Sequence, residues 1–421
     1  MDKIKKMFEN HTKEKITALL FLTVIFGMFI GMMLNVRTVG ASFITAYRTN
    51  VPTGAPYIER IEGAIAAAES AVNEGAFQRQ KYIELYGLSQ RAMSKNVITD
   101  YNYGSLYKTT YGQITFAGVE RYVDDSCGAT YDLVNQLISD DIDFLYIQLP
   151  FKLPPAKYGG DAQLPANVKD HANDNADKFV AALDAASVKT YDLRDDFWTS
   201  GMSQNELFFD TDHHWSIQGA FMATGLIADY LNENYDMQIP ENLYTEENFN
   251  FETYKNSYIG SMGRRVGRIY GGIDDFTLIT PKFDTDYTIL HVNSADADIA
   301  NGVGVEKFTG TFGEALLEND YMTNPDPTTN RYAVYHGDYR EIHFINNLAE
   351  NDKKILIIKD SFSLPVYSFL SLGIKEVRAV DMRLFDRNVA EYAAEYDPDL
   401  VILMYNADSF ADPMFNFHMG E

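Results

Sequence analysis

The sequence predicts an α/β protein in which helices flank a parallel β-sheet, preceded by one N-terminal transmembrane helix. Of the 421 residues, 46% are hydrophobic and 14% aromatic, so the chain buries a large core and is not disordered. From about residue 112, short apolar runs alternate with helical stretches, the pattern of a parallel sheet covered by helices. Residues 16–34 are nineteen uncharged positions, long enough as a helix to cross a hydrocarbon layer of about 30 Å.

The flanks of the apolar segment predict its orientation. Five lysines lie before it, at positions 3, 5, 6, 13 and 15, and only Arg37 follows closely. The positive-inside rule then places the N-terminus in the cytoplasm and the rest outside. We expect residues 1–37 to be a cytoplasmic tail and a single-pass anchor in the cell membrane. Val39-Gly40-Ala41 also fits a signal-peptidase site, but the apolar run exceeds the usual signal-peptide core of about 7–15 residues.

The charge balance excludes one class of partner. The chain has 35 Lys and Arg against 60 Asp and Glu, a net charge of −25. Residues 1–37 hold six basic and three acidic side chains, which leaves 29 against 57, or −28, for the remainder. So acidic a surface repels polyanions, and we expect no nucleic-acid partner. The single cysteine, Cys127, excludes an intramolecular disulfide and a Cys-rich metal site, and we expect no cofactor.

The segments after the anchor differ in character. Residues 38–58 contain two glycines and two prolines with little periodicity, which is typical of a stalk. Residues 59–95 are rich in alanine and other helix formers, which predicts a helical segment packed on the main domain, with a break at Gly75.

The main domain is expected to span residues 96–421. Its predicted strands are residues 112–119, 143–150, 188–194, 353–359, 375–382 and 399–406. Its predicted helices include residues 129–139, 174–186 and 216–232, the last with Ser216 as N-cap. Residues 238–350 are rich in Tyr, Asn, Asp and Gly and break the alternation, so we expect a large insertion packed on the sheet edge.

The first segment with candidate catalytic residues is FFDTDHHWSIQGA, residues 208–220. Asp212 precedes His214 by two residues and can accept the ring N–H, which fixes the tautomer and strengthens the imidazole as a base. We predict Asp212 as the orienting group and His214 as the general base, with His213 and Trp215 in the core. A metal site of Asp210, Asp212 and the two histidines is the alternative, disfavoured because adjacent histidines in extended chain point to opposite faces.

The second segment is ILIIKDSFSLPVYSFL, residues 355–370, a buried strand followed by a helix whose first turn tolerates Pro365. Ser361 at the junction would lie at the carboxyl edge of the sheet, where free helix amides stabilise an oxyanion. An ordinary N-cap is the alternative interpretation. Together with Asp212 and His214, Ser361 completes a set of nucleophile, base and orienting group.

These motifs resemble those of the DHHW proteins and the related alginate O-acetyltransferase-like exported enzymes. The resemblance is carried by ELYGLSQRAM, DTDHHW, IIKDSFS, AVDMR and VILMYN, and covers most of residues 80–410. It implies an SGNH-hydrolase-like domain with permuted motif order and a triad of Asp212, His214 and Ser361. One departure is that Lys359 replaces the glycine of the family's Gly-Asp-Ser motif.

The resemblance also implies an activity and partners. It implies an extracytoplasmic O-acetyltransferase that modifies a cell-surface or secreted polysaccharide through an acetyl-serine intermediate. Because acetyl-CoA is cytoplasmic, a multi-pass membrane acyltransferase is expected to supply the acetyl groups. A carbohydrate acetylesterase with the same triad and a non-catalytic glycan-binding scaffold subunit remain alternatives.

Further binding residues are predicted on weaker grounds. The family resemblance implies a glycine and an asparagine as further oxyanion donors, and Gly337 and Asn406 are the candidates, although both residue types are common at turns and strand ends. Arg383 is a candidate for contact with an acyl or sugar group, and pairing with an acid is its alternative role.

Two other features suit a glycan. Arg264 and Arg265, which cluster with Arg268, are candidates for holding an anionic glycan, or for neutralising nearby carboxylates. Trp215 is a candidate for sugar stacking, although a core position is the preferred interpretation.

Overall fold

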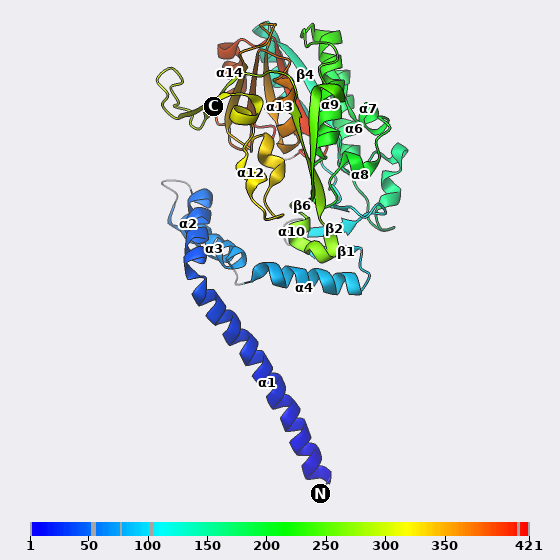
Figure 1. Ribbon diagram of the computed structural model, residues 1–421, viewed down its shortest axis with the longest axis vertical. Coiled ribbons are helices and arrows are strands. Elements are labelled where there is room, and N and C mark those ends of the chain that lie inside the picture. The colour runs from blue at the N-terminus through cyan, green and yellow to red at the C-terminus, as the bar shows by residue number, and fades with distance from the viewer. Residues whose placement is uncertain (1, 52–55, 76–77, 101–103, 411–412, 420–421) are drawn as a thin grey trace. The chain divides into compact units, whose positions relative to one another are not determined.

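The computed structural model describes residues 2–51, 56–75, 78–100, 104–410 and 413–419. The chain forms two compact units, Met1–Tyr86 and Gly87–Glu421. The first contains the helices α1 (Asp2–Leu34), α2 (Val36–Asn50) and α3 (Tyr57–Glu74) and the beginning of α4 (Arg79–Ala92). The second contains all the strands of the described chain (Figure 1).

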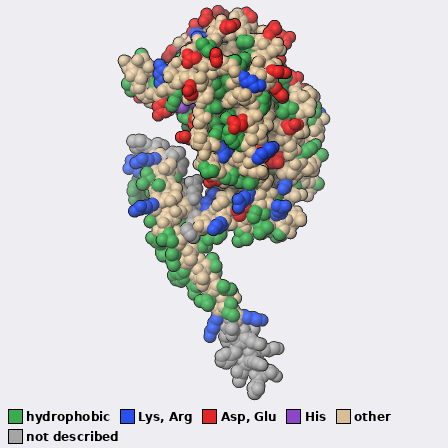
Figure 2. Space-filling model, in the orientation of Figure 1, with side chains coloured by type: hydrophobic (Ala, Val, Ile, Leu, Met, Phe, Trp, Pro, Cys, Tyr) green, Lys and Arg blue, Asp and Glu red, His purple; other side chains and the backbone are tan. Residues whose placement is uncertain are grey.

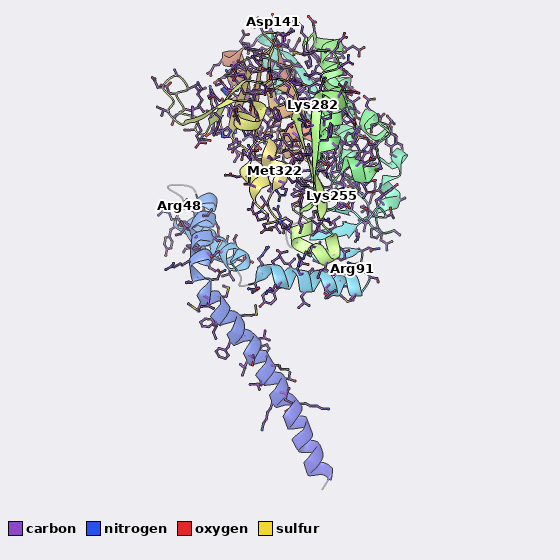
Figure 3. All side chains as sticks on the ribbon, viewed as in Figure 1. Arg48, Arg91, Asp141, Lys255, Lys282 and Met322 are labelled. Atoms are coloured by element: carbon purple, nitrogen blue, oxygen red, sulfur yellow. The ribbon has the colours of Figure 1, made fainter. Side chains whose placement is uncertain are left out.

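Helix α1 confirms the expected apolar helix. Its segment Lys13–Leu34 is 22 residues long, about 33 Å at 1.5 Å per residue, and therefore long and apolar enough to cross a membrane. Its side chains project outward around the helix (Figure 3), and those on the visible face are mostly hydrophobic (Figure 2). The part expected to be an irregular stalk is instead helical over Val36–Asn50, because that stretch contains only one helix breaker, Gly40. Pro52 and Gly54 lie outside the described residues.

The second unit is built on an eight-stranded sheet with the order β5-β4-β13-β11-β12-β10-β8-β9. The first five strands are parallel: β5 (Thr190–Asp192), β4 (Asp143–Leu149), β13 (Leu400–Asn406), β11 (Lys354–Lys359) and β12 (Glu376–Asp381). The other three pair antiparallel with their neighbours, so that β8 runs in the same direction as the first five: β10 (Glu341–Asn346), β8 (Tyr287–Val292) and β9 (Val305–Gly310). The predicted parallel sheet is therefore confirmed. The insertion does more than pack on its edge, since it supplies three of the sheet's strands.

Two small sheets accompany the large one. One contains β1 (Val97–Asp100), β2 (Gly104–Lys108) and β3 (Ile114–Thr115), and the other pairs β6 (Phe249–Tyr258) with β7 (Asp274–Pro281). The strand predicted at 112–119 is thus only two residues long and lies outside the main sheet. The visible face of this unit is dotted with acidic side chains (Figure 2), as the charge balance predicts.

Helices cover both faces of the main sheet. One face carries α5 (Asp124–Ser139), α6 (Ala172–Ala185) and α14 (Val389–Tyr396), whose apolar side chains pack against Leu356 and Ile358. The other carries α9 (Ile217–Tyr235) and α13 (Leu364–Leu370), which pack against Ile355 and Ile357. Successive residues of β11 therefore face opposite cores, as a strand buried on both sides requires.

Short elements complete the unit. They are the helices α7 (Arg194–Trp198), α8 (Gln204–Leu207), α10 (Gly263–Val266), α11 (Arg268–Gly271) and α12 (Asp320–Thr323), and single turns at Ala156–Tyr158, Gly160–Gln163, Glu246–Asn248, Phe312–Leu316, Arg331–Tyr335 and Ser361–Ser363.

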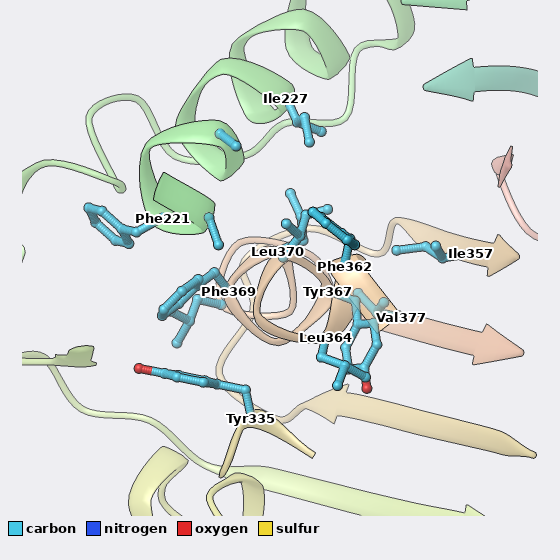
Figure 4. Packing of buried hydrophobic residues seen from close by; sticks show 14 of the residues in the cluster. Phe221, Ile227, Tyr335, Ile357, Phe362, Leu364, Tyr367, Phe369, Leu370 and Val377 are labelled. Carbon is cyan, nitrogen blue, oxygen red and sulfur yellow. The ribbon is translucent and has the colours of Figure 1, made fainter. Parts of the chain in front are cut away.

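Helix α13 lies between α9 and the sheet (Figure 4). Phe362, Leu364 and Phe369 are buried there, and Ile227 of α9 and Val377 of β12 belong to the same core. Burial of each such side chain contributes about 1.5–3 kcal/mol. The chain on both sides of Ser361 is therefore anchored in the core, which holds that serine in place.

Candidate active site

The DHHW segment is a loop closed by its own backbone. Phe208 and Trp215 form an isolated antiparallel bridge, and Ser216 caps α9 by accepting the Gly219 N–H at 2.9 Å. The Trp215 indole is fully buried and donates to the Phe362 carbonyl and the Tyr332 hydroxyl, at 3.0 Å each. Trp215 therefore ties this loop to the segment that carries Ser361. It fills the core, as preferred, and its candidacy for sugar stacking is wrong because no part of its ring is accessible.

The loop brings Asp212, His214 and Ser361 together. His214 Nδ1 lies 2.7 Å from Asp212 Oδ1, and His214 Nε2 lies 2.8 Å from Ser361 Oγ. Asp212 and His214 are buried, whereas Ser361 is partly exposed. With Nδ1–H donated to the carboxylate, Nε2 is left with a lone pair aimed at the serine hydroxyl.

The Asp212 carboxylate is held by four hydrogen bonds. Oδ1 accepts from His214 Nδ1 and from the His214 backbone N–H at 3.0 Å, and Oδ2 accepts from the Tyr258 hydroxyl at 2.8 Å and the Ser261 N–H at 2.7 Å. Burial alone would raise the pKa of Asp212, but His213 and His214 beside it outweigh that effect and hold the pKa well below its usual range. Asp212 is therefore ionised at neutral pH.

Two further residues, Lys152 and Gly260, lie against Asp212. The buried Lys152 ammonium donates to the carbonyls of Ile114 (2.9 Å) and Asp212, and burial lowers the pKa of this lysine to about 8. Gly260 lies so close to Asp212 that a Cβ atom would be 2.2 Å from the Asp212 Cβ. Only glycine permits this approach, which places Tyr258 and Ser261 on the carboxylate.

The two histidines have different surroundings. The His214 ring is stacked on Tyr332, with ring centroids 4.0 Å apart and planes at 12°. His213 Nδ1 instead lies 2.9 Å from the Ser261 hydroxyl, and desolvation together with the neighbouring His214 lowers the pKa of His213 to about 3. His213 is therefore neutral at physiological pH and does not contact Ser361 in the hydrogen-bond network of the described residues.

The same groups bear on the metal alternative. Ligand atoms of Asp212, His213 and His214 lie within 4.8 Å of one another. However, both ring nitrogens of His214 and both oxygens of Asp212 already make hydrogen bonds, which a metal ion would have to break. Asp210 is absent from the group, and its carboxylate accepts from Asn205 at 2.9 Å. The donor set fits proton transfer better than metal binding.

Ser361 opens into a cleft of about 130 Å³. The cleft is lined by Phe116, Phe151, His213, Asp360, Ser361, Phe362, Arg383, Asn406, Asp408, Ser409 and Met414. The Phe362 N–H donates to the Asp360 carboxylate at 2.9 Å. Within the described chain, no hydrogen bond from the Ser361 N–H is formed, so this amide is available to a developing oxyanion in the cleft.

The predicted oxyanion donor Asn406 does line this cleft. Its side-chain amide donates to the Pro150 carbonyl at 2.5 Å, and its oxygen accepts the Asp408 N–H at 3.0 Å. Its backbone N–H donates to Asp360, the residue before the serine, at 2.6 Å. In this arrangement Asn406 fixes the end of β13 beside the serine segment.

Arg383 pairs with acids, which is the alternative role given for it, and it also lines the cleft. Its guanidinium bonds Asp381 in a bidentate fashion (2.8 and 2.5 Å) and lies 3.0 Å from Asp338. The buried Lys359 ammonium contacts the same two carboxylates, at 2.8 and 2.6 Å. Although burial raises it, the pKa of Asp381 falls to about 2 because Arg383 and Lys359 stabilise the carboxylate. Lys359, the departure from the family motif, thus points away from Ser361 into this network.

The remaining predicted residues lie outside the cleft. The Gly337 N–H donates to Glu318 at 3.2 Å, so Gly337 is not an oxyanion donor in this structure. Arg264 donates to the Thr328 carbonyl at 2.9 Å, and Arg265 pairs with Asp100 at 3.3 Å. Arg265 therefore neutralises a carboxylate, the alternative given for this cluster.

One stretch of the chain is similar to the SGNH-hydrolase-like proteins. Residues 137–268, which include Asp212 and His214, match the family model described as the SGNH hydrolase-like domain of the acetyltransferase AlgX. The predicted resemblance is therefore confirmed. No curated protein matches the sequence.

Solved structures share the fold. Bacillus cereus PatB1, determined with a sulfonyl adduct, superposes with a TM-score of 0.60 at 21% identity, over 76% of this chain and 99% of that one. A DHHW family protein from Eubacterium siraeum superposes with a TM-score of 0.56 at 16% identity, over 77% of this chain and 96% of that one. At these identities the likeness establishes the fold alone.

Proposed function

We propose that this protein is a membrane-anchored O-acetyltransferase that transfers acetyl groups to hydroxyls of a cell-surface or secreted polysaccharide. One observation carries the proposal: Asp212, His214 and Ser361 form a continuous hydrogen-bonded chain, of 2.7 and 2.8 Å, that ends in an open cleft. The match of residues 137–268 to an acetyltransferase domain supports the choice of group.

In the first half-reaction, Ser361 Oγ attacks the carbonyl carbon of an acetyl donor while His214 Nε2 takes the hydroxyl proton. The charge that develops on the carbonyl oxygen faces the Ser361 N–H. Asp212 stabilises the imidazolium. The bond to the donor's leaving group then breaks, His214 returns the proton to that group, and the acetyl remains on the serine.

In the second half-reaction, a sugar hydroxyl attacks the carbonyl carbon of the acetyl-serine while His214 Nε2 takes its proton. The bond between the acetyl group and Ser361 Oγ then breaks, and His214 returns the proton to that oxygen, which leaves the acetyl group on the sugar. Water competes at about 55 M, but holding the hydroxyl in line with the acyl carbon supplies effective molarities on the order of 10⁵ M or more. Transfer therefore requires a bound glycan, whereas an esterase would use the same three residues with water.

The donor and the location follow from the chemistry. Acetyl-CoA is cytoplasmic, so a multi-pass membrane acyltransferase is the proposed partner that delivers acetyl groups across the membrane. Helix α1 would keep this domain next to that partner, on the extracytoplasmic side. When the outer barrier of the cells is opened so that added protease reaches the outer face of the cell membrane, the protease should remove the domain. Protection of the domain from the protease would contradict this orientation.

The test uses the full chain in detergent with p-nitrophenyl acetate. Ser361→Ala, His214→Ala and Asp212→Ala should each abolish most turnover with unchanged melting temperature, and combining them should add little, because the three act as a unit. The matched control is His213→Ala, which should be milder.

Other outcomes identify the alternatives. Equal loss in His213→Ala and His214→Ala with rescue by Zn²⁺ would favour a metal site. Turnover that yields only acetate with every polymer offered would leave an esterase. No turnover from a folded wild-type chain would leave a scaffold subunit.

A further inference from the structure

We propose that a second pocket on the same sheet edge binds a sugar unit of a neutral or amino-bearing glycan. The pocket has a volume of about 350 Å³ and shares no lining residue with the Ser361 cleft. It is lined by His291, Glu306, Phe308, Glu314, Ala315, Leu317, Glu318, Asn319, Asp320, His336 and Tyr339, and we refer to it as the edge pocket. That this glycan is the acceptor of the acetyl group rests on the proposed function.

Two imidazoles in the edge pocket have unused nitrogens. His291 and His336 are 3% and 2% exposed, and Nε2 of each has no hydrogen-bond partner in the described chain. His336 Nδ1 lies 3.1 Å from Glu318 Oε1, which leaves Nε2 as an acceptor. A buried polar atom without a partner costs about 1–3 kcal/mol, so two such atoms on residues that line one pocket indicate that a polar ligand satisfies them.

Burial keeps these histidines neutral. It lowers the pKa of His291 to about 4, assisted by the neighbouring His336, and it lowers the pKa of His336 as well. The other polar lining groups include four carboxylates, and none of the described lining residues is Lys or Arg. The pocket therefore accepts hydrogen bonds and repels anions, which excludes uronate units and favours hydroxyl or ammonium groups.

Aromatic side chains give the pocket a surface for a sugar ring. Tyr339 stacks on His291 with ring centroids 3.9 Å apart, and Phe308 packs against His291 at 4.8 Å. Phe308 is 39% exposed on strand β9. An exposed aromatic ring beside carboxylates and imidazoles suits a ligand with apolar ring faces and polar edges.

The position of the edge pocket relates it to the serine. Ser361 follows the carboxyl end of β11, and His291 is near the carboxyl end of β8, which pairs with the start of β10 at the same edge of the sheet. From β11 to β8 is three strand spacings of about 4.8 Å, or about 14 Å. A polymer chain of a few sugar units spans this distance.

One loop joins the two sites. His336 and Tyr339 line the edge pocket, while Asp338 between them pairs with Lys359 and Arg383 beside the cleft. A glycan bound in the edge pocket would thus lie along the edge that leads to the acetyl-serine.

The test measures saccharide binding to the full chain in detergent by calorimetry. The probes are hexamers of cellulose, chitosan and polygalacturonate, which are neutral, cationic and anionic. We expect the neutral or the cationic hexamer to bind and the anionic one not to bind. Phe308→Ala and His291→Phe should each weaken that binding about tenfold or more, because they remove a ring surface and an acceptor. Phe251→Ala, on β6 with a side chain that is 38% exposed, is the matched control and should bind as the wild type does.

Four outcomes would overturn the proposal of a saccharide pocket. Failure of both non-anionic hexamers to bind, preference for the anionic hexamer, or binding unaffected by Phe308→Ala and His291→Phe would each do so. Stoichiometric Zn²⁺ binding that His291→Phe removes, without saccharide binding, would make the pocket a metal site. If saccharide binding depends on the pocket but the wild type turns over no acetyl ester, the pocket stands and the proposed acetyl transfer fails.

Discussion

Asp212→Asn tests how the carboxylate sets the histidine tautomer. Each oxygen of Asp212 accepts from two donors, one of them a backbone N–H: that of Ser261 lies 2.7 Å from Oδ2, and that of His214 lies 3.0 Å from Oδ1. The oxygen of an asparagine side chain would turn toward the shorter of these two contacts, at Ser261. Its NH₂ group would then face His214 Nδ1, and the imidazole would have to accept there and carry its proton on Nε2. That tautomer cannot take the proton of Ser361.

Both orientations of the asparagine place its NH₂ group against a backbone N–H, that of His214 in the first and that of Ser261 in the opposite one. The opposite orientation is worse, because its two buried donors would meet at a contact that is now 2.7 Å instead of 3.0 Å. We therefore expect the inactive tautomer to dominate and kcat to fall about 10⁴-fold, or about 5.5 kcal/mol in the barrier, as in serine proteases that lose the orienting aspartate.

The assay is p-nitrophenyl acetate turnover by the full chain, with melting temperature as the folding control. Asp210→Asn is the matched variant, because Asp210 lies in the same loop but accepts only from Asn205 among the side chains of the described chain. It should retain nearly full activity. An Asp212→Asn enzyme within tenfold of wild type would refute the assigned role of Asp212.

Three further predictions concern the supports of the two sites. Gly260→Ala would place a Cβ atom 2.2 Å from that of Asp212, and the resulting shift should reduce ester turnover about 100-fold, measured beside the thermal melt. Lys359→Met would remove one of the cations that pair with buried Asp381 and should lower the free energy of unfolding, measured in urea, by about 3–5 kcal/mol. The control is Lys255→Met, at an exposed pair with Asp275, which should lower it by less than about 1 kcal/mol (Lys255 is labelled in Figure 3). Between pH 6.5 and about 4 the unfolded chain binds a proton at His291 that the folded chain does not, so the free energy of unfolding should fall as the pH drops through this window. Urea titrations at several pH values should show a smaller fall for His291→Phe than for the wild type.

The central strands and the three residues at Ser361 were predictable for a local reason. Residues 355–358 and 400–404, inside the predicted strands 353–359 and 399–406, are apolar throughout because a central parallel strand is buried on both faces. The carboxyl ends of such strands meet at one edge, so a serine just after β11 and an Asp-x-His pair before α9 converge there.

The surroundings of Asp212 and His214 were not predictable, because they come from the insertion. Tyr258, Gly260 and Ser261 reach Asp212 from a segment with no repeating pattern, and Tyr332, which stacks on His214, lies further along the same insertion. A lone glycine or tyrosine there carries no local signal, since its role depends on a contact 46 or more residues away in the sequence. For the same reason, the sequence did not predict that β8, β9 and β10 belong to the main sheet.

The predicted binding residues failed where type alone was the argument. Trp215 looks suited to a sugar, but its ring is fully buried in the core. Gly337 looks like a free amide, but Glu318 accepts its N–H. Burial decided the first case and a hydrogen-bond partner the second, and the sequence reveals neither.

The most direct test of acetyl transfer is mass spectrometry of the full chain after brief exposure to p-nitrophenyl acetate. We predict one acetyl group on the peptide that contains Ser361, none in Ser361→Ala, and loss of that group to a glycan when the accepted hexamer is added. Wild-type turnover that continues without any acetyl on Ser361, or with the acetyl group on another residue, would contradict the account.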